Sequence, residues 1–336
     1  MRIKAKRMIL IIVVCIVVYL VAGAMGPFIK YKDVSSQTAE EFRADSFRSS
    51  EAGTDRAMLL ETSESALEHR IRLINGAKTR IILSTFDMRN GESTKDLLSV
   101  IWHKAEEGVK VQILVDGVSG LIRMEPDPLF HAVASHPNIQ IKIYNPVNPL
   151  MPWKTQGRMH DKYVIVDDSA YILGGRNTFD YFLGDYDSKN KSLDREVLIY
   201  NTAQGEENSG ESSLFQVEAY FNRVWNLDVC RLFHDDEGQQ KKKRIQKQME
   251  LLEARYQELR EKQEGFFDTT YDYTAHTCAA NRIRLVSGPI GIYGKEPDIF
   301  YTLTELMKQA QERVVIHTPY VVTNDYMNET LAEIVD

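Results

Sequence analysis

The chain has 336 residues, of which 43% are apolar, 26% charged and 10% aromatic. This composition excludes a collagen-like, a wholly disordered or a disulfide-dense chain, and the length suffices for two domain-sized units or for one domain built from two halves. The formal net charge of −7 excludes the general basic field of nucleic-acid-binding proteins, although a local basic patch stays compatible with it.

An uninterrupted apolar run occupies residues 8–25. As a helix it would be about 27 Å long, which just reaches across the hydrocarbon core of a bilayer. The cations ahead of it are Arg2, Lys4, Lys6 and Arg7. Cations in this position favour the cytoplasmic side, so we predict that residues 1–30 form a single-pass signal-anchor and that the remaining chain lies outside the cytoplasm. The alternative is a cleaved signal peptide, because residues 22–24 (Ala-Gly-Ala) have the small-x-small form of a cleavage site.

Residues 31–57 are polar, rich in Ser and Glu, and predict a stalk between membrane and domain. Regular elements begin near residue 58. The expected elements are a helix over 66–77, a strand over 80–86, a helix over 95–107, a strand over 109–115 and two short strands over 164–166 and 171–173. Alternation of this kind predicts an α/β fold with a mostly parallel sheet flanked by helices.

An internal repeat links the two ends of the folded region. Residues 306–318 align without a gap on residues 73–85, with identical residues at four of the thirteen positions. The repeat predicts that residues 281–336 begin a second copy of the domain in residues 58–237. Between them, residues 238–265 are highly charged with an apolar stripe at helical spacing, which predicts an amphipathic helix on the domain or on a partner.

The three cysteines do not determine the redox compartment of the chain. Cys15 lies in the apolar run, and Cys230 and Cys278 either form a disulfide in an oxidising compartment or stay two separate thiols. Because the sequence has neither a CxxC pair nor a Cys/His cluster with metal-ligand spacing, we expect no metal site.

The most informative stretch is residues 158–177. His160 and Lys162 are two positions apart on an extended segment, so their side chains leave the same face. The Gly174-Gly175 pair lets the backbone turn closely and presents Asn177 beside that face. An imidazole, an ammonium and an amide would then converge on one pocket. This set suits a phosphate diester, because His can attack phosphorus or protonate a leaving oxygen while Lys and Asn donate to the charged oxygens.

The spacing H-x-K-x4-D-x6-G-G-x-N resembles the signature of the phospholipase D superfamily at every specified position. The matching residues are His160, Lys162, Asp167, Gly174, Gly175 and Asn177. Other segments resemble more closely the bacterial cardiolipin synthases of this superfamily. These segments are 135–139, Asn145-Pro146, 158–160, 174–177 and 318–320. The resemblance covers roughly residues 60–336, and it implies that residues 58–237 form a first phospholipase D-like domain and that 281–336 begin a second, incomplete one.

The resemblance also implies a reaction. It implies a metal-independent, cofactor-free transfer in two steps through a phosphohistidine, with His160 as one of the paired catalytic histidines. Lys162 and Asn177 would hold the phosphoryl oxygens.

An acidic residue that follows the G-G-x-N strand orients the histidine in this family. Asp194 lies where that residue is expected and would accept a hydrogen bond from the ring nitrogen that faces away from phosphorus, with Glu196 as its rival. The resemblance gives Asp167 the task of stabilising a turn rather than touching substrate, and Gly174 and Gly175 are structural.

Active members of the family bring two such motifs together, one histidine acting as nucleophile and the other as acid and base, whereas this sequence carries one motif. We therefore expect the second motif from a C-terminal half beyond Asp336 or from a second copy in a homodimer.

The leading hypothesis is a membrane-anchored phosphatidyltransferase that converts two phosphatidylglycerols into cardiolipin and glycerol. The alternatives are a phospholipase D or nuclease that uses water, and a catalytically silent membrane scaffold. The acidic net charge and the anchor favour a phospholipid over a nucleic acid. The proline-rich loop over residues 146–153, just ahead of His160, either forms an apolar rim that faces lipid or packs as an ordinary loop.

Overall fold

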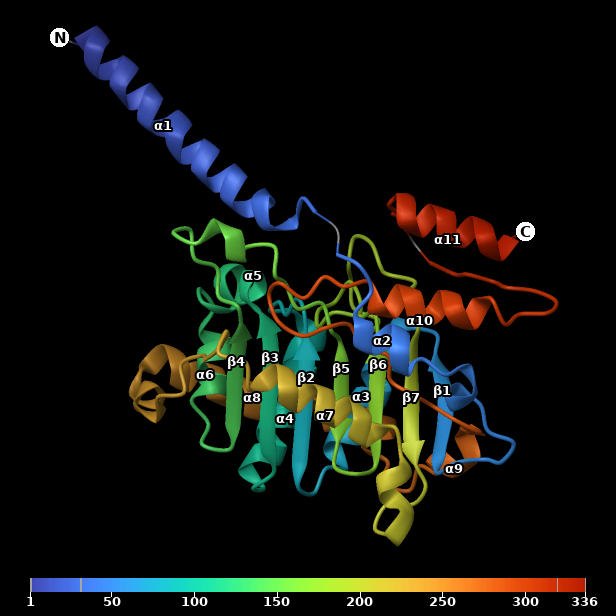
Figure 1. Cartoon of the computed structure of the whole chain (residues 1–336). Coiled ribbons are helices and arrows are strands. Elements are labelled where there is room, and N and C mark those ends of the chain that lie inside the picture. The colour runs from blue at the N-terminus through green and yellow to red at the C-terminus, as the bar shows by residue number, and fades with distance from the viewer. Residues whose placement is uncertain (1, 31, 319, 336) are drawn as a thin grey trace.

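The computed structural model describes residues 2–30, 32–318 and 320–335. Tyr31 of the expected stalk, Pro319 of the segment 318–320 and Asp336 of the second repeat lie outside the described residues. A single sheet of nine strands forms the centre of the molecule, with helices on both faces (Figure 1).

The strand order is β8-β4-β3-β2-β5-β6-β7-β1-β9. The strands are β1 Asp55–Leu60, β2 Arg80–Thr85, β3 Lys110–Asp116, β4 Ile139–Tyr144, β5 Tyr163–Val166, β6 Ala170–Gly174, β7 Glu196–Asn201, β8 Cys230–Leu232 and β9 Cys278–Ala279. The pairs β2–β3 and β3–β4 are parallel, and every other neighbouring pair in the described sheet is antiparallel.

The expected α/β class with flanking helices is confirmed, but the expectation of a mostly parallel sheet is wrong, because the sheet is mixed. Parallel neighbours need a long crossover, and the connections that contain α4 between β2 and β3 and α6 between β3 and β4 supply one for each parallel pair. The turn over residues 167–169 between β5 and β6 is so short that these two strands can only run antiparallel.

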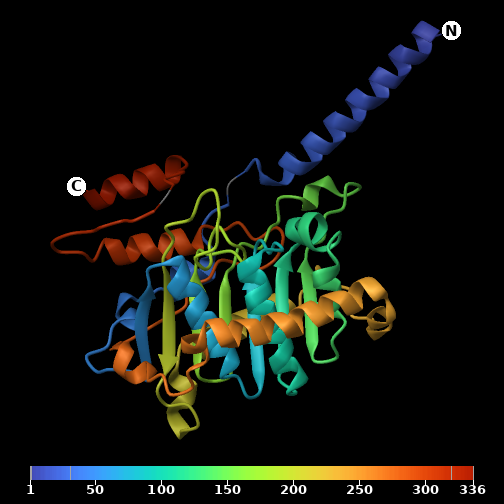
Figure 2. The same ribbon diagram turned by 180° about the vertical axis from the view of Figure 1, so that it is seen from behind.

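The helices are α1 Arg2–Met25, α2 Ser36–Glu41, α3 Ser63–Asn75, α4 Glu92–Glu106, α5 Gly117–Ser119, α6 Pro128–Ala134, α7 Leu214–Trp225, α8 Lys243–Lys262, α9 Tyr273–His276, α10 Asp298–Met307 and α11 Asp325–Val335. Figure 1 and Figure 2 show the two layers: α3, α4, α6 and α8 cover one face of the sheet, and α7 covers the other.

Two predicted helices begin about three residues earlier than expected. At α3 the Thr62 hydroxyl accepts from the backbone N–H of Ser65 and forms a capping box. At α4 the Asp180 carboxylate, from a distant loop, accepts from the N–H groups of Glu92 and Ser93. Each cap satisfies amides that a helix end would otherwise leave unpaired, so the helices extend to these caps.

The segment 238–265 contains α8, which lies across α4 and α6. Its apolar stripe is buried in the core on that face of the sheet. The buried residues of the stripe are Ile245, Leu252, Tyr256 and Leu259. Of the two expected sites for this stripe, the domain is therefore the one that the structure shows.

The N-terminal region combines a projecting helix with a packed segment. The part Lys4–Met25 of α1 has a mean hydropathy of 3.0, is not buried, and is long and apolar enough to cross a membrane. The expected stalk is not a free linker. Ser35 and Thr38 donate to the Asp298 carboxylate, and the Phe42 ring packs edge-on against a ring of α10.

The second repeat forms its helices but not its strand. When residue 306 is aligned with residue 73, as in the sequence repeat, α10 corresponds to α3 and α11 to α4. By the repeat alignment, residues 313–318 correspond to residues 80–85 of the predicted strand, so a strand is expected there. The described structure has none in this segment, and Val315 is 77% exposed. A strand is stable only when a neighbour pairs with its backbone groups, and none of the described strands lies beside this segment.

The two cysteines of the folded region are both free thiols. Cys230 lies in β8 and Cys278 in β9, which form the two opposite edges of the sheet. The disulfide alternative is therefore not realised in this structure.

Candidate active site

The antiparallel hairpin of β5 and β6 brings His160, Lys162 and Asn177 to the same end of the sheet. His160 and Lys162 directly precede β5, and Asn177 follows β6. Because Tyr163 at the start of β5 pairs with Leu173 near the end of β6, the segments before β5 and after β6 are neighbours. The predicted convergence of these three residues therefore has a simple origin in strand register.

His160 and Lys162 are in direct contact. The Lys162 Nζ lies 2.8 Å from the His160 Nδ1 and 2.7 Å from the His160 carbonyl oxygen. The lysine side chain is buried, whereas the histidine is exposed. The Phe86 ring flanks both groups, with its centroid 4.8 Å from the imidazole and 5.7 Å from Nζ.

Burial sets the charges of this pair. It lowers the pKa of Lys162 to about 8, against the opposing effect of the Asp161 and Asp194 carboxylates. Burial, and then the nearby lysine charge, lowers the pKa of His160 below its usual value of 6.5. At pH 7 the site therefore holds a neutral imidazole beside an ammonium. Since an ammonium only donates, Nδ1 accepts here and Nε2 carries the ring proton.

The two acidic candidates have different surroundings. Asp194 lies beside Gly175, close enough to Lys162 to affect its pKa, and its Oδ2 accepts from the Ser192 hydroxyl at 3.2 Å. Among the residues that the structure describes, no hydrogen bond joins His160 to Asp194, and the Nδ1 atom of His160 is paired with the Lys162 ammonium.

Glu196, the alternative to Asp194, forms an ion pair away from His160. It is 1% exposed, and its two carboxylate oxygens accept from the Arg70 guanidinium at 2.7 Å each. A bidentate pair of this kind occupies the carboxylate and makes Glu196 a structural residue of β7.

The glycine pair is explained by close packing rather than by the close turn that the sequence suggested. Neither glycine has a left-handed φ. A Cβ on Gly174 would lie 2.3 Å from the Glu196 Cγ, and one on Gly175 would lie 3.0 Å from the Asp194 Oδ1. Side chains of β7 and its preceding segment fill the space that a larger residue would need.

Asn177 lies with His160 in an open cleft of about 660 Å³. Its Oδ1 accepts from the Asp87 backbone N–H at 3.1 Å, which leaves the amide NH2 as the end that can donate to a ligand. The other lining residues are Phe86, Asp87, Arg89, Asn90, Gly91, Phe179, Asp180, Tyr181, Phe182, Asp187, Ser188, Lys189 and Asn190. Lys162 and Asp194 lie behind this surface rather than on it.

Asp167 lies at the far end of the hairpin, in the β5–β6 turn, with a φ of 47°. Its carboxylate accepts from the backbone N–H groups of Lys78, Thr79 and Arg80 and from the Thr79 hydroxyl. Burial raises its pKa, but these hydrogen bonds outweigh burial and hold the pKa below its usual range. Asp167 thus ties the turn to the start of β2, away from the cleft.

The sequence analysis missed the residues that follow β2 and β3. Phe86, Asp87 and Arg89 line the cleft directly after β2. Asp116 ends β3, is fully buried, and accepts from the backbone N–H of Met159, the residue before His160, at 3.0 Å. The sequence did contain a signal for these residues: they lie at or directly after the ends of predicted strands, and binding sites of α/β sheets lie at the carboxyl ends of parallel strands.

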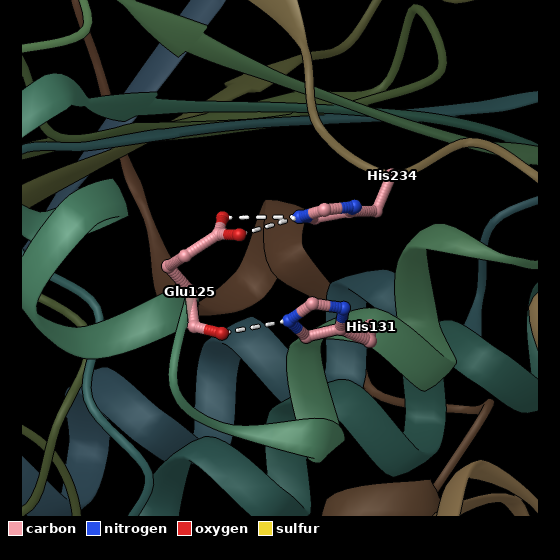
Figure 3. A group of neighbouring side chains, drawn as sticks. All are labelled: Glu125, His131 and His234. Atoms are coloured by element: carbon pink, nitrogen blue, oxygen red, sulfur yellow. Dashed lines mark hydrogen bonds and ion pairs between the residues drawn. The ribbon is translucent and has the colours of Figure 1, made fainter.

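A second polar cluster, away from the cleft, consists of Glu125, His131 and His234 (Figure 3). It is the one group among the described residues whose spacing could suit a metal ion. The His131 Nε2 lies 2.8 Å from the Glu125 carbonyl oxygen, so it carries a proton and is not a ligand in this arrangement. The His234 Nε2 pairs with the Glu125 carboxylate at 2.9 Å, and the two imidazoles stack at 4.3 Å. The two Nε2 atoms are thus both paired with Glu125, whereas the buried His131 Nδ1 has no hydrogen-bond partner among the described residues. We assign no metal to the cluster.

Comparison with known proteins places this geometry in context. Residues 70–225 match the family described as cardiolipin synthase, PLD-like domain. An uncharacterized protein of Helicobacter pylori is 35% identical over 150 residues, which cover 41% of this chain and 29% of that protein. Cardiolipin synthase C of Escherichia coli is 29% identical over 136 residues, which cover 37% of this chain and 28% of that protein. The chain thus matches less than a third of the length of these curated relatives.

The fold is also found in a solved structure, that of a phosphatidylserine synthase from Haemophilus influenzae. The TM-score is 0.54 at 16% identity, and the match covers 89% of this chain and 64% of the other. At this identity the likeness concerns the fold alone.

The close approach of β6 and β7 leads to a prediction on stability. Gly174→Ala should lower the free energy of unfolding by about 1–3 kcal/mol, because the added methyl group must displace Glu196 from its pairing with Arg70. Chemical denaturation followed by circular dichroism measures this change. The control is Gly210→Ala, where no atom lies within 4 Å of the added carbon. Equal stability of the two variants would show that close packing does not explain the motif glycine.

Proposed function

We propose that this protein, a member of the phospholipase D superfamily with a cardiolipin synthase-like domain over residues 70–225, transfers phosphatidyl groups between phospholipids. The observation that carries the proposal is that His160 and Asn177 line one cleft and that the Lys162 ammonium contacts His160 from behind it. The specific reaction that we propose joins two phosphatidylglycerols into cardiolipin and releases glycerol.

Substrate binding would rearrange the histidine–lysine pair. An anionic phosphate oxygen in the cleft accepts from the Asn177 NH2 and draws the Lys162 ammonium away from the His160 Nδ1. The ring proton can then reside on Nδ1, where Asp194 would accept it in the role that the family resemblance implies, and Nε2 gains a free lone pair. The neutral imidazole that the site holds at pH 7 is the form that this step needs.

The transfer takes two displacements at phosphorus. In the first, Nε2 of the motif histidine forms a bond to phosphorus, the bond from phosphorus to the glycerol oxygen breaks, and a general acid protonates that oxygen. In the second, the glycerol hydroxyl of another phosphatidylglycerol attacks, its proton passes to the same acid–base group, and the phosphorus–nitrogen bond breaks. The acid–base group is the histidine of a second motif, which a longer chain or a second copy supplies. Electrons and protons balance without a metal or cofactor.

Hydrolysis is the alternative outcome of the same intermediate, with water in place of the second glycerol hydroxyl. A nuclease would use this chemistry on a polyanion. The net charge of −7 and the apolar helix α1 favour a phospholipid. Incubation with phosphatidylglycerol separates the reactions, because transfer yields cardiolipin and hydrolysis yields phosphatidic acid.

A phosphohistidine trap tests the proposal. With phosphatidylglycerol labelled at phosphorus, rapid acid-free denaturation of a preparation that contains the second motif should retain label on the protein, and His160→Asn should abolish cardiolipin formation. The matched control is His276→Asn, at an exposed histidine outside the cleft, which should keep full activity. Cardiolipin synthesis that persists in His160→Asn would exclude the proposed role of this residue.

The pKa values predict a bell-shaped dependence of kcat/KM on pH. On the acid side, activity should fall where His160 becomes protonated, and this limb should lie below the usual histidine range because the pKa of His160 is lowered. Activity should fall again above about pH 8, because Lys162 loses its charge. Lys162→Arg keeps a charged donor at every accessible pH, so its basic limb should move to higher pH even if its maximal rate is lower. A basic limb near pH 8 that stays in place in Lys162→Arg would assign that limb to another group.

We further infer that α1 spans the cytoplasmic membrane and that the domain lies on its outer side, because cations precede the apolar run. Cys278 gives a direct measurement, since its thiol is exposed on β9 whereas Cys230 is buried. In intact spheroplasts a membrane-impermeant maleimide should label the protein, and Cys278→Ser should remove the label. Labelling that requires prior lysis of the spheroplasts would place the domain in the cytoplasm.

A further inference from the structure

We propose that the loop over residues 148–153 inserts into the interfacial layer of the bilayer beside α1, so that the domain is attached to the membrane at two places. The proposal rests on the membrane-spanning role of α1 and is independent of the catalytic mechanism. It concerns a surface whose occupant is the lipid bilayer itself.

The loop exposes large apolar side chains next to the site. Leu150 is 77% exposed, Met151 38% and Trp153 37%, within six residues that also hold two prolines. Scattered single apolar residues are normal on a protein surface, but neighbouring ones that include an aromatic ring mark a contact with a partner or a membrane. Trp is also the residue that proteins favour at the boundary between lipid and water.

The same loop packs against the last turns of α1. The Tyr19 hydroxyl donates to the Leu150 carbonyl oxygen at 2.9 Å. Gly23 approaches so closely that a Cβ there would lie 2.5 Å from the Pro152 Cγ. Figure 1 and Figure 2, which view the molecule from opposite sides, both show this loop beneath the end of α1.

This contact fixes the depth of the loop. The apolar segment of α1 extends to Met25, and Tyr19 lies six residues earlier. At about 1.5 Å per residue, Tyr19 is about 9 Å inside the end of the helix along its axis. A loop that binds Tyr19 must therefore reach to a similar depth when α1 spans the bilayer. Interfacial segments of proteins lie about 5–10 Å deep, so the exposed apolar side chains of the loop fit this layer.

The surroundings of the loop suit the head-group region. Lys30 follows α1 with an exposed side chain, and Lys154 directly follows the loop. Cations at this level attract anionic lipids. Because the loop lies only a few residues before His160, insertion would also hold the cleft near the lipid surface; this last consequence depends on the proposed function. Of the two interpretations of the loop that the sequence left open, the contact with α1 favours the rim that faces lipid.

Depth-dependent quenching tests the insertion in the full chain. Leu150→Cys is labelled with the fluorophore NBD in a background of Cys15→Ala and Cys278→Ser, and reconstituted into vesicles of phosphatidylcholine and phosphatidylglycerol. The control position is Asn208→Cys, an exposed residue in the helical turn Glu207–Glu211, which lies at the opposite end of the sheet (Figure 1). Lipids that carry a nitroxide near the head group should quench the label at position 150 at least about twofold more than at position 208, and its emission should be blue-shifted. Equal quenching and water-like emission at both positions would overturn the proposal.

A second variant separates insertion from misfolding. Gly23→Leu should push the loop off α1, since its side chain meets Pro152, and should reduce the quenching at position 150. The circular dichroism spectrum and unfolding curve should stay unchanged, because Gly23 lies outside the domain core. Labelling at Trp153→Cys replaces position 150 if Leu150→Cys does not fold. None of these readouts requires turnover, so absence of insertion and absence of phosphatidyl transfer are distinguishable results.

Discussion

The antiparallel pairing of β5 with β6 is the constraint on which the candidate site depends. It brings the residues before β5, His160 and Lys162, beside Asn177, which follows β6. The same hairpin pairs onward with β7, and that second pairing leaves room for nothing larger than glycine at position 174. The opposite end of the hairpin is tied to β2 by the Asp167 carboxylate. Strand register, rather than loop conformation, therefore sets the distances between the chemical groups.

Desolvation gives these groups their chemical character. Lys162 lies behind the cleft surface, where burial lowers its pKa to about 8. Partial burial of His160, and then the nearby lysine charge, lower the pKa of the imidazole and keep it uncharged at pH 7. Two buried carboxylates, at the end of β3 and at the start of β7, support this arrangement. Asp116 holds the backbone just before His160, and Glu196 pairs with Arg70 beneath the motif glycine. Hydrogen bonds from buried groups thus fix the backbone on both sides of the proposed catalytic pair, and such fixed groups are what a preorganised site needs.

A short stretch of chain links the proposed attachment to the membrane with the proposed chemistry. The loop over residues 148–153 contacts α1 on one side and continues into the segment that carries His160 on the other. For a water-soluble enzyme its exposed Leu150 and Trp153 would be a liability. For an enzyme whose substrate stays in the bilayer, the same side chains place the cleft where the phosphate groups are.

The sequence by itself determined the apolar run over residues 8–25, the extents of α3 and α4 to within a few residues, and the motif residues, because each depends on local spacing. Only the tertiary structure decided strand direction, the reason for Gly174, and the pairing of Glu196 with Arg70, since each depends on which segments become neighbours. The strand expected over residues 313–318 failed for the same reason: an apolar segment becomes a strand only beside another strand. Local pattern selects which residues can act, and contacts between distant segments decide what each of them does.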